Sequence, residues 1–201
     1  MNKIILFVLL TASNFLSSQS LEIKELWRIN KKYDSILVGY QNKAKDSLSD
    51  LSKKEKKKIM VENENRIANE KRKFELDLLE KIKAIDEKSK LSFVSSKTLK
   101  CENINKEVNE FNKLNKNKYI ATDENQGIKL KNKNEQLSTI LTFIVSEKGY
   151  ISNVKATGAN QEFNRENELI LYKLGRFKPQ CVDGFTQTAR FRMPVTMKFD
   201  K

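Results

Sequence analysis

The stretch 137–199 decides the fold, and its segments read LSTILTFIV (137–145), SEKG (146–149), YISNVKAT (150–157), NRENELILYKLG (164–175) and ARFRMPVTMKF (189–199). The first segment is rich in β-branched and aromatic residues and is apolar on both faces, a pattern typical of a central strand. The turn residues that follow include Gly149, which adopts positive φ at little cost. These features predict an antiparallel hairpin of 137–145 with 150–156.

A helix and a third strand are predicted to complete this unit. Asn164 is the expected N-cap of the helix, and Gly175 is the expected residue at its C-terminal end. The spacing of Ile170, Leu171, Leu174 and Phe177 predicts the buried stripe. The last segment alternates cleanly, which predicts a half-buried strand whose apolar face the helix covers. Its inward side chains are expected to be Phe191, Met193, Val195, Met197 and Phe199.

The last strand is the candidate functional site. Pro194 lacks a backbone donor, which is tolerated on an edge strand and not within a sheet. We therefore expect 189–199 to have one free edge. Its basic residues protect that edge from aggregation, or the edge accepts a strand from a partner; the sequence favours neither. The candidate residues are Arg190, Arg192, Pro194, Thr196 and Lys198.

The segments before this unit are mainly helical by pattern. Apolar residues at steps of three and four predict a helix over 21–51, and Ser52 with Glu55 forms a capping box that starts a second helix near 53. No Gly or Pro interrupts 53–90, so the two helices are expected to form an antiparallel hairpin. The stretch 91–100 is ambiguous between strand and loop, and 103–115 has helical spacing.

The predicted organisation has four parts and belongs to the α+β class. Residues 1–19 are a signal peptide, 20–95 a helical hairpin with coiled-coil-like character, 96–135 a short helix and connector, and 136–201 a ββαβ domain. In that domain a three-stranded antiparallel sheet is packed by one helix.

The first residues have the pattern of an export signal. Asn2 and Lys3 precede an apolar run over 4–10, and small residues follow at 17, 18 and 20. This pattern predicts a cleaved secretory signal, and retention as a membrane anchor is the alternative. In an oxidising compartment, a single pair of cysteines predicts a disulfide between Cys101 and Cys181; two free buried thiols are the alternative.

Composition bears on which classes of function to expect. The chain has a net charge of +13 and no His. The Lys-rich run 53–58 fits a contact with nucleic acid or anionic lipid, but interleaved Glu residues and the absence of an aromatic platform favour a solvated helix face. No metal-spaced cluster, phosphate-binding loop or nucleophile motif is present. We expect no enzyme, cofactor, metal, nucleic acid or small-molecule substrate.

The terminal stretch resembles the C-terminal domain of TonB-type energy transducers. The similarity is carried by LTFIVSEKGYISNVKATG (141–158), by the helix, and by GRFKPQCVDGFTQTARFRMPVTMKFD (175–200). It covers about a third of the chain, and Phe177 stands where the family usually has Trp. The matching positions are Glu147, Gly149, Ile151, Val154, Phe177, Pro179, Gly184, Pro194, Val195 and Phe199.

This resemblance implies a periplasmic envelope protein that binds a protein partner, such as a segment of an outer-membrane receptor, at the edge of its sheet. The chain departs from the family in having no His and only two Pro, so a Pro-rich spacer is missing and binding is expected without energy transduction. Two alternatives stay open. The helical hairpin self-associates as an envelope scaffold, or residues 1–19 anchor an atypical transducer in the inner membrane.

Overall fold

A computed structural model describes residues 20–48, 51–89, 99–115 and 136–197. The chain divides into two compact units, one over Leu21–Ile82 and the other containing the chain from Lys83 onward. The architecture is α+β, with helices first and a three-stranded antiparallel sheet with a helix after them, as the sequence predicts. The predicted signal peptide, most of 91–100, the connector 116–135, Lys198 and Phe199 lie outside the described residues.

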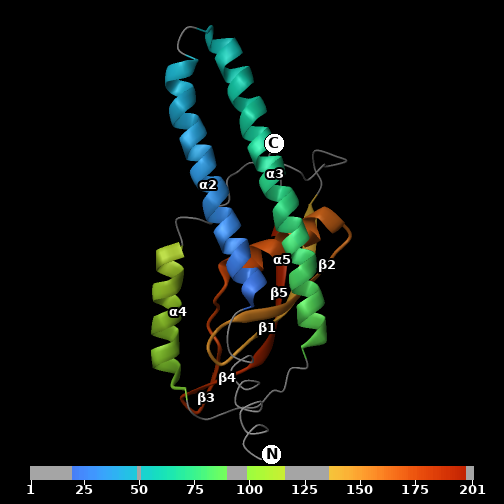
Figure 1. The fold of residues 1–201 in the computed structure, drawn as a ribbon. Helices are drawn as coiled ribbons and strands as arrows, with labels where there is room; N and C mark the ends of the chain where they lie inside the picture. The colour runs from blue at the N-terminus through green and yellow to red at the C-terminus, as the bar shows by residue number, and fades with distance from the viewer. Residues whose placement is uncertain (1–19, 49–50, 90–98, 116–135, 198–201) are drawn as a thin grey trace, which may run out of the picture. The chain divides into compact units, whose positions relative to one another are not determined.

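The first unit is built from two long helices, α2 (Leu21–Ser47) and α3 (Lys53–Lys88), of which α3 extends beyond it (Figure 1). The predicted capping box starts α3. The N–H of Glu55 donates to Oγ of Ser52 at 3.4 Å, and the N–H of Ser52 donates to Oε2 of Glu55 at 3.3 Å. These reciprocal bonds satisfy donors that the first helical turn leaves unpaired.

Polar side chains join α2 to α3 along much of their length. The hydroxyl of Tyr33 donates to Oε1 of Glu70 at 2.9 Å. Lys71 forms an ion pair with Asp34 at 2.9 Å. Nε2 of Gln41 donates to Glu64 at 2.9 Å. These bonds add to the buried apolar side chains of the two helices, among them Leu26 and Leu79.

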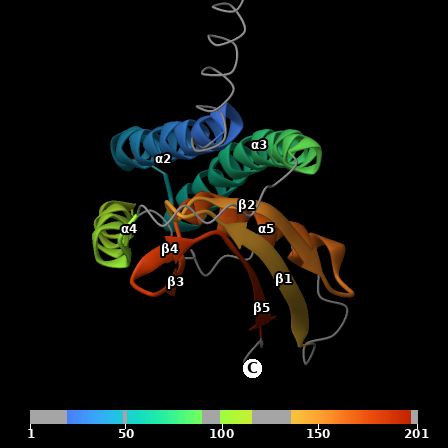
Figure 2. The same ribbon diagram turned by 90° about the horizontal axis from the view of Figure 1, so that it is seen from below.

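The second unit is organised around β1 (Leu137–Val145), which lies between β2 (Ile151–Thr157) and β5 (Ala189–Met197) (Figure 2). Both neighbours are antiparallel to β1. The tight turn joining β1 to β2 has Gly149 at φ 82°. Its amide donates to the carbonyl of Ser146 at 2.8 Å. The central position of 137–145 and the hairpin are thus confirmed.

A bulge in β2 changes which residues of that strand are buried. Thr142 faces Lys155 and Ile144 faces Ser152, so Asn153 and Val154 together oppose Phe143. Asn153 has a φ of 52°. Because the extra residue shifts the alternation, Ile151 and Val154 are both buried. Simple alternation, which groups Tyr150 with Val154 and Ala156, does not describe this strand.

Helix α5 (Gln161–Leu174) begins earlier than the sequence predicts. Its N-cap is Asn160, whose side chain accepts the N–H of Phe163 at 2.9 Å. The predicted cap, Asn164, lies inside the helix and donates to the carbonyl of Gly158. The expected C-terminal residue, Gly175, is confirmed with φ 74°.

The buried face of α5 also differs from the prediction. Ile170 is 57% exposed, and the buried residues are Phe163, Asn167, Glu168, Leu169, Leu171 and Tyr172. The helix packs mainly on β2 and β1. Of the predicted stripe, Leu171 is buried, but the prediction placed Ile170 inside and left out Glu168 and Tyr172, which are buried with polar partners.

Helix α4 (Cys101–Asn115) is fastened to the sheet unit at two places. At its start, Cys101 forms the predicted disulfide with Cys181 in a ribbon of β3 (Gln180–Val182) and β4 (Phe185–Gln187). Further along, the guanidinium of Arg176 lies 5.9 Å from the ring centre of Phe111 and 5.1 Å from that of Tyr150. The ribbon itself is an element that the sequence analysis missed.

Candidate functional site

The candidate site residues are on β5, which forms one outer edge of the three-stranded sheet. Its pairing with β1 runs unbroken from Leu137 opposite Met197 to Val145 opposite Ala189. Within the described residues no further strand pairs with β5. The predicted edge residues within the described range are all exposed: Arg190, Arg192, Pro194 and Thr196.

Hydrogen bonds at β2 show which way the backbone of β5 points. The N–H of Ala156 donates to Oε1 of Glu168 at 2.8 Å, so it points away from β1. Leu141 is paired with Ala156 on one side and with Met193 on the other. Its backbone N–H and C=O therefore point toward β5. The direction alternates along an antiparallel strand. The residues whose backbone groups point to the outer edge are then Arg190, Arg192, Pro194 and Thr196.

This direction explains the position of the proline. The nitrogen of Pro194 faces the outer edge, so its missing N–H removes nothing from the ladder with β1. Arg192 and Thr196, on either side of it, turn ordinary N–H groups outward. The edge thus offers a discontinuous row of backbone donors and acceptors beside positively charged side chains.

The apolar face of β5 rests on an aromatic cluster. The ring of Phe191 stacks on Phe143 with centroids 5.6 Å apart, and it meets Phe177 edge-on at 5.7 Å. Phe143 and Phe177 also make an edge contact at 5.7 Å. Phe177 directly follows the segment that ends α5, so the cluster ties β5 to the rest of the unit. These contacts hold the edge in a fixed position.

The opposite edge of the sheet, on β2, is closed by side chains. Its donors at Ala156, Val154 and Asn153 are each satisfied within the chain. The N–H of Ala156 donates to Glu168 at 2.8 Å, that of Val154 to the hydroxyl of Tyr172 at 3.1 Å, and that of Asn153 to Oδ2 of Asp86 at 2.5 Å. A strand approaching β2 would have to displace these bonds.

The side chains that close β2 form one polar network. The hydroxyl of Tyr172 donates to Oδ2 of Asp86 at 2.6 Å, and Lys83 pairs with Glu168 at 2.9 Å. Burial raises the pKa of Asp86, although the bonds from Tyr172 and Asn153 act the other way. Burial, followed by the charge of Asp86, raises the pKa of Tyr172, which therefore stays a hydroxyl donor.

Sequence reasoning missed this network because its members are far apart in the chain. Asp86 and Tyr172 are separated by 86 residues, and Lys83 and Glu168 by 85. The sequence did contain one local sign of the network, because Glu168 and Tyr172 lie one helical turn apart on α5. Their spacing places both on the face toward the sheet.

The described residues carry no cluster of three or more His, Cys, Asp or Glu side chains that could hold a metal ion. Among the same residues, none of the helices combines the length and the apolar character needed to cross a membrane. No protein-family model matches the chain, and no curated protein or solved structure matches it either.

Proposed function

We propose that this chain is an exported, periplasmic envelope protein with a TonB C-terminal-like domain that binds a protein partner through the outer edge of β5. In this mode a segment of the partner, for example from an outer-membrane receptor, adds a fourth strand to the sheet. Backbone hydrogen bonds supply affinity, and alternate side chains supply selectivity.

The observation that carries the proposal is the difference between the two edges. The donors of β2 are occupied by Glu168, Tyr172 and Asp86. The outer backbone groups of β5 have no strand beside them in the described part of the chain. Of the two, β5 is therefore the edge that a partner strand can join without breaking existing bonds.

The charge of this edge favours an acidic partner segment. Arg190 and Arg192 are exposed on one face of β5, and residues 136–201 carry ten basic and six acidic residues, a net charge of 10 − 6 = +4. Complementary charge mainly raises the rate of association and selects among partners. Binding should therefore weaken as the salt concentration rises.

A matched pair of variants tests the pairing mode. Thr196→Pro removes an outward N–H without touching the ladder to β1, while Thr196→Ala removes the same side chain and keeps the donor. We expect Thr196→Ala to capture envelope proteins as the native chain does. Thr196→Pro should weaken binding about fivefold, because one backbone bond of about 1 kcal/mol is lost. Circular dichroism checks that both variants fold. Equal capture by the two variants excludes strand pairing.

Self-association of the α2–α3 hairpin is the second candidate function. Apolar side chains on both helices are partly exposed, among them Val38 at 55%, Val61 at 45% and Phe74 at 45%. A scaffold built on this hairpin would be oligomeric. Light scattering of the full chain over a hundredfold range of concentration decides between the candidates, because a monomer throughout leaves only the binding role.

A further inference from the structure

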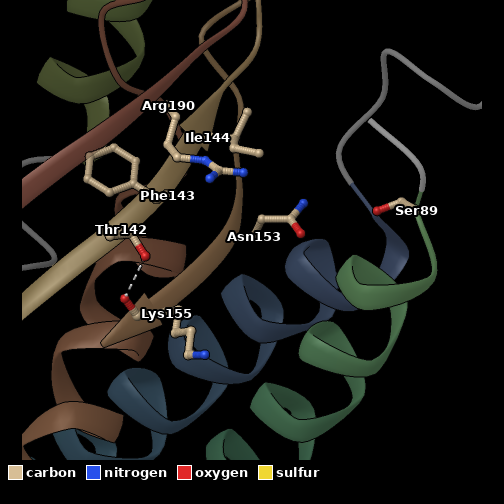
Figure 3. Close-up of a pocket in the computed structure, with 7 residues that line it drawn as sticks. All are labelled: Ser89, Thr142, Phe143, Ile144, Asn153, Lys155 and Arg190. Atoms are coloured by element: carbon tan, nitrogen blue, oxygen red, sulfur yellow. Dashed lines mark hydrogen bonds between the residues drawn. The ribbon is translucent and has the colours of Figure 1, made fainter. Parts of the chain in front are cut away.

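The sheet carries a hollow on the face where Thr142, Ile144 and Arg190 project (Figure 3). Its volume is about 470 Å³, and it lies within the second unit. Arg190 is opposite Ile144 across the β1–β5 ladder. The described residues that line the hollow are Ser89, Thr142, Phe143, Ile144, Asn153, Lys155 and Arg190.

The polar lining of this hollow consists of hydrogen-bond donors and cations. Figure 3 shows the guanidinium of Arg190 extending past Ile144 toward the amide of Asn153. Lys155 adds a second cation, and the described residues that line the space include no Asp or Glu. Neither Arg190 nor Lys155 forms an ion pair with another described residue. The described lining therefore carries a net positive charge.

Asn153 gives this space a specific donor. The β2 bulge places it with φ 52°, so its backbone is fixed by the strand pairing on either side. Its backbone N–H is used by Asp86, which does not line the hollow. The side-chain Nδ2 is buried and has no hydrogen-bond partner. Buried donors are nearly always satisfied, so this atom calls for an acceptor that the described residues do not provide.

We propose that the hollow binds a carboxylate group, held by the guanidinium of Arg190 and by Nδ2 of Asn153, with Lys155 adding charge. The planar guanidinium fork matches the two oxygens of a carboxylate. The apolar side chain of Ile144 beside this space disfavours a doubly charged phosphate, because the loss of hydration of phosphate is more costly. This site does not depend on strand pairing at β5, and it identifies the chemical group that the sheet face recognises.

The test is a titration of the ¹⁵N-labelled full chain, monitored by NMR at constant ionic strength. The probes are succinate, inorganic phosphate, and a blocked peptide with one Glu among Gly and Ala. We expect the side-chain resonances of Asn153 and Arg190 to shift saturably with a carboxylate probe. Saturation by succinate identifies a free carboxylate ligand, and saturation by the peptide alone identifies an acidic protein segment. Absence of saturable shifts, or tighter binding of phosphate, overturns the proposal.

Three variants separate a built site from general positive charge. Arg190→Gln should weaken carboxylate binding about tenfold or more, because a charge-assisted bond is lost. Arg165→Gln makes the same change of charge at an exposed position of α5 outside the hollow, and should leave binding within about twofold. Asn153→Gly keeps the positive φ and removes the amide, and should weaken binding severalfold. Equal losses in Arg190→Gln and Arg165→Gln would overturn the site.

Discussion

Gly149 combines a positive φ with close packing against two other parts of the chain. Its φ is 82°, and a Cβ there would lie 2.7 Å from the carbonyl oxygen of Phe177 and 2.9 Å from Cγ2 of Val108. The carbonyl of Gly149 also accepts the N–H of Phe177 at 2.8 Å. The glycine thus provides both the hairpin turn and the close approach of the chain that follows α5.

We predict that Gly149→Ala lowers the free energy of unfolding by at least about 1–2 kcal/mol, the cost of the left-handed conformation alone. The contact with Phe177 adds to this cost. Gly39→Ala is the control, because that glycine is helical and open space surrounds it; it should raise stability by up to about 1 kcal/mol. Urea denaturation measures both, and a neutral Gly149→Ala would contradict the geometry.

Asp86 should make stability depend on pH in an unusual direction. Burial raises its pKa in the folded chain above the unfolded value of about 3.9. Between these two values the folded state holds a proton that the unfolded state has released. The contribution of Asp86 to stability is therefore present below the unfolded pKa and is lost as pH rises through the folded pKa.

Asp86→Asn removes this titration while it keeps an acceptor for Tyr172 and Asn153. We predict that its free energy of unfolding, from urea curves between pH 4 and 7, falls less with rising pH than that of the native chain. Asp77→Asn, whose carboxylate is exposed and paired with Lys81, is the control and should keep the native slope. If the free energies of unfolding of the native chain and of Asp86→Asn changed with pH in parallel, the titration of Asp86 would not be coupled to folding.

At the scale of elements, the sequence specified β1 and β5 better than it specified the helix that packs on the sheet. The alternation of β5 permits only one register, because a slip of one residue would turn its apolar side chains to the other face. For α5 the two candidate caps, Asn160 and Asn164, are one turn apart and chemically the same. The choice between them depends on the bonds of Glu168 and Tyr172 to β2, which no local pattern contains.

The same reason limits what could be foreseen of the candidate site. The exposed edge residues of β5 follow from Pro194 and from period-two alternation, both local signals. The closure of β2 depends on Asp86, and the β2 bulge depends on how Asn153 and Val154 share one partner, Phe143. Contacts between distant segments set both features, so the contrast between the two edges could be found only in the structure.

The β3–β4 ribbon is the element most dependent on the disulfide. Three residue pairs join its strands, and Cys101–Cys181 fastens it to the start of α4 across 80 residues of sequence. We predict that Cys181→Ser lowers the free energy of unfolding by about 2–4 kcal/mol, with an upper limit near 4.5 from chain entropy. Reductant should have the same effect on the native chain and none on the variant, as urea denaturation can show. If reductant also destabilised Cys181→Ser, its effect on the native chain would not come from the Cys101–Cys181 bond.

At the scale of the whole molecule, the two units differ in how they are held together. The α2–α3 hairpin relies on polar bonds between its helices, such as Tyr33 with Glu70. The sheet unit has the aromatic cluster, the closed β2 edge and the disulfide. The unit that contains the candidate site is therefore the more constrained one, as a fixed binding edge requires.

The proposed export would link the disulfide to the proposed function, because the thiols of a cytosolic chain would be kept reduced. We predict that the native protein, isolated with its thiols trapped by alkylation, starts near residue 19 or 21 by mass spectrometry and has both Cys101 and Cys181 protected. The same chain made without residues 2–16 should be alkylated at both cysteines, since it stays in the reducing compartment. A native protein that keeps its first residues would favour the anchored alternative, and one with free thiols would exclude an oxidising location. The two readouts are independent, so agreement between them would place the open edge of β5 in the envelope, where the proposed partner is found.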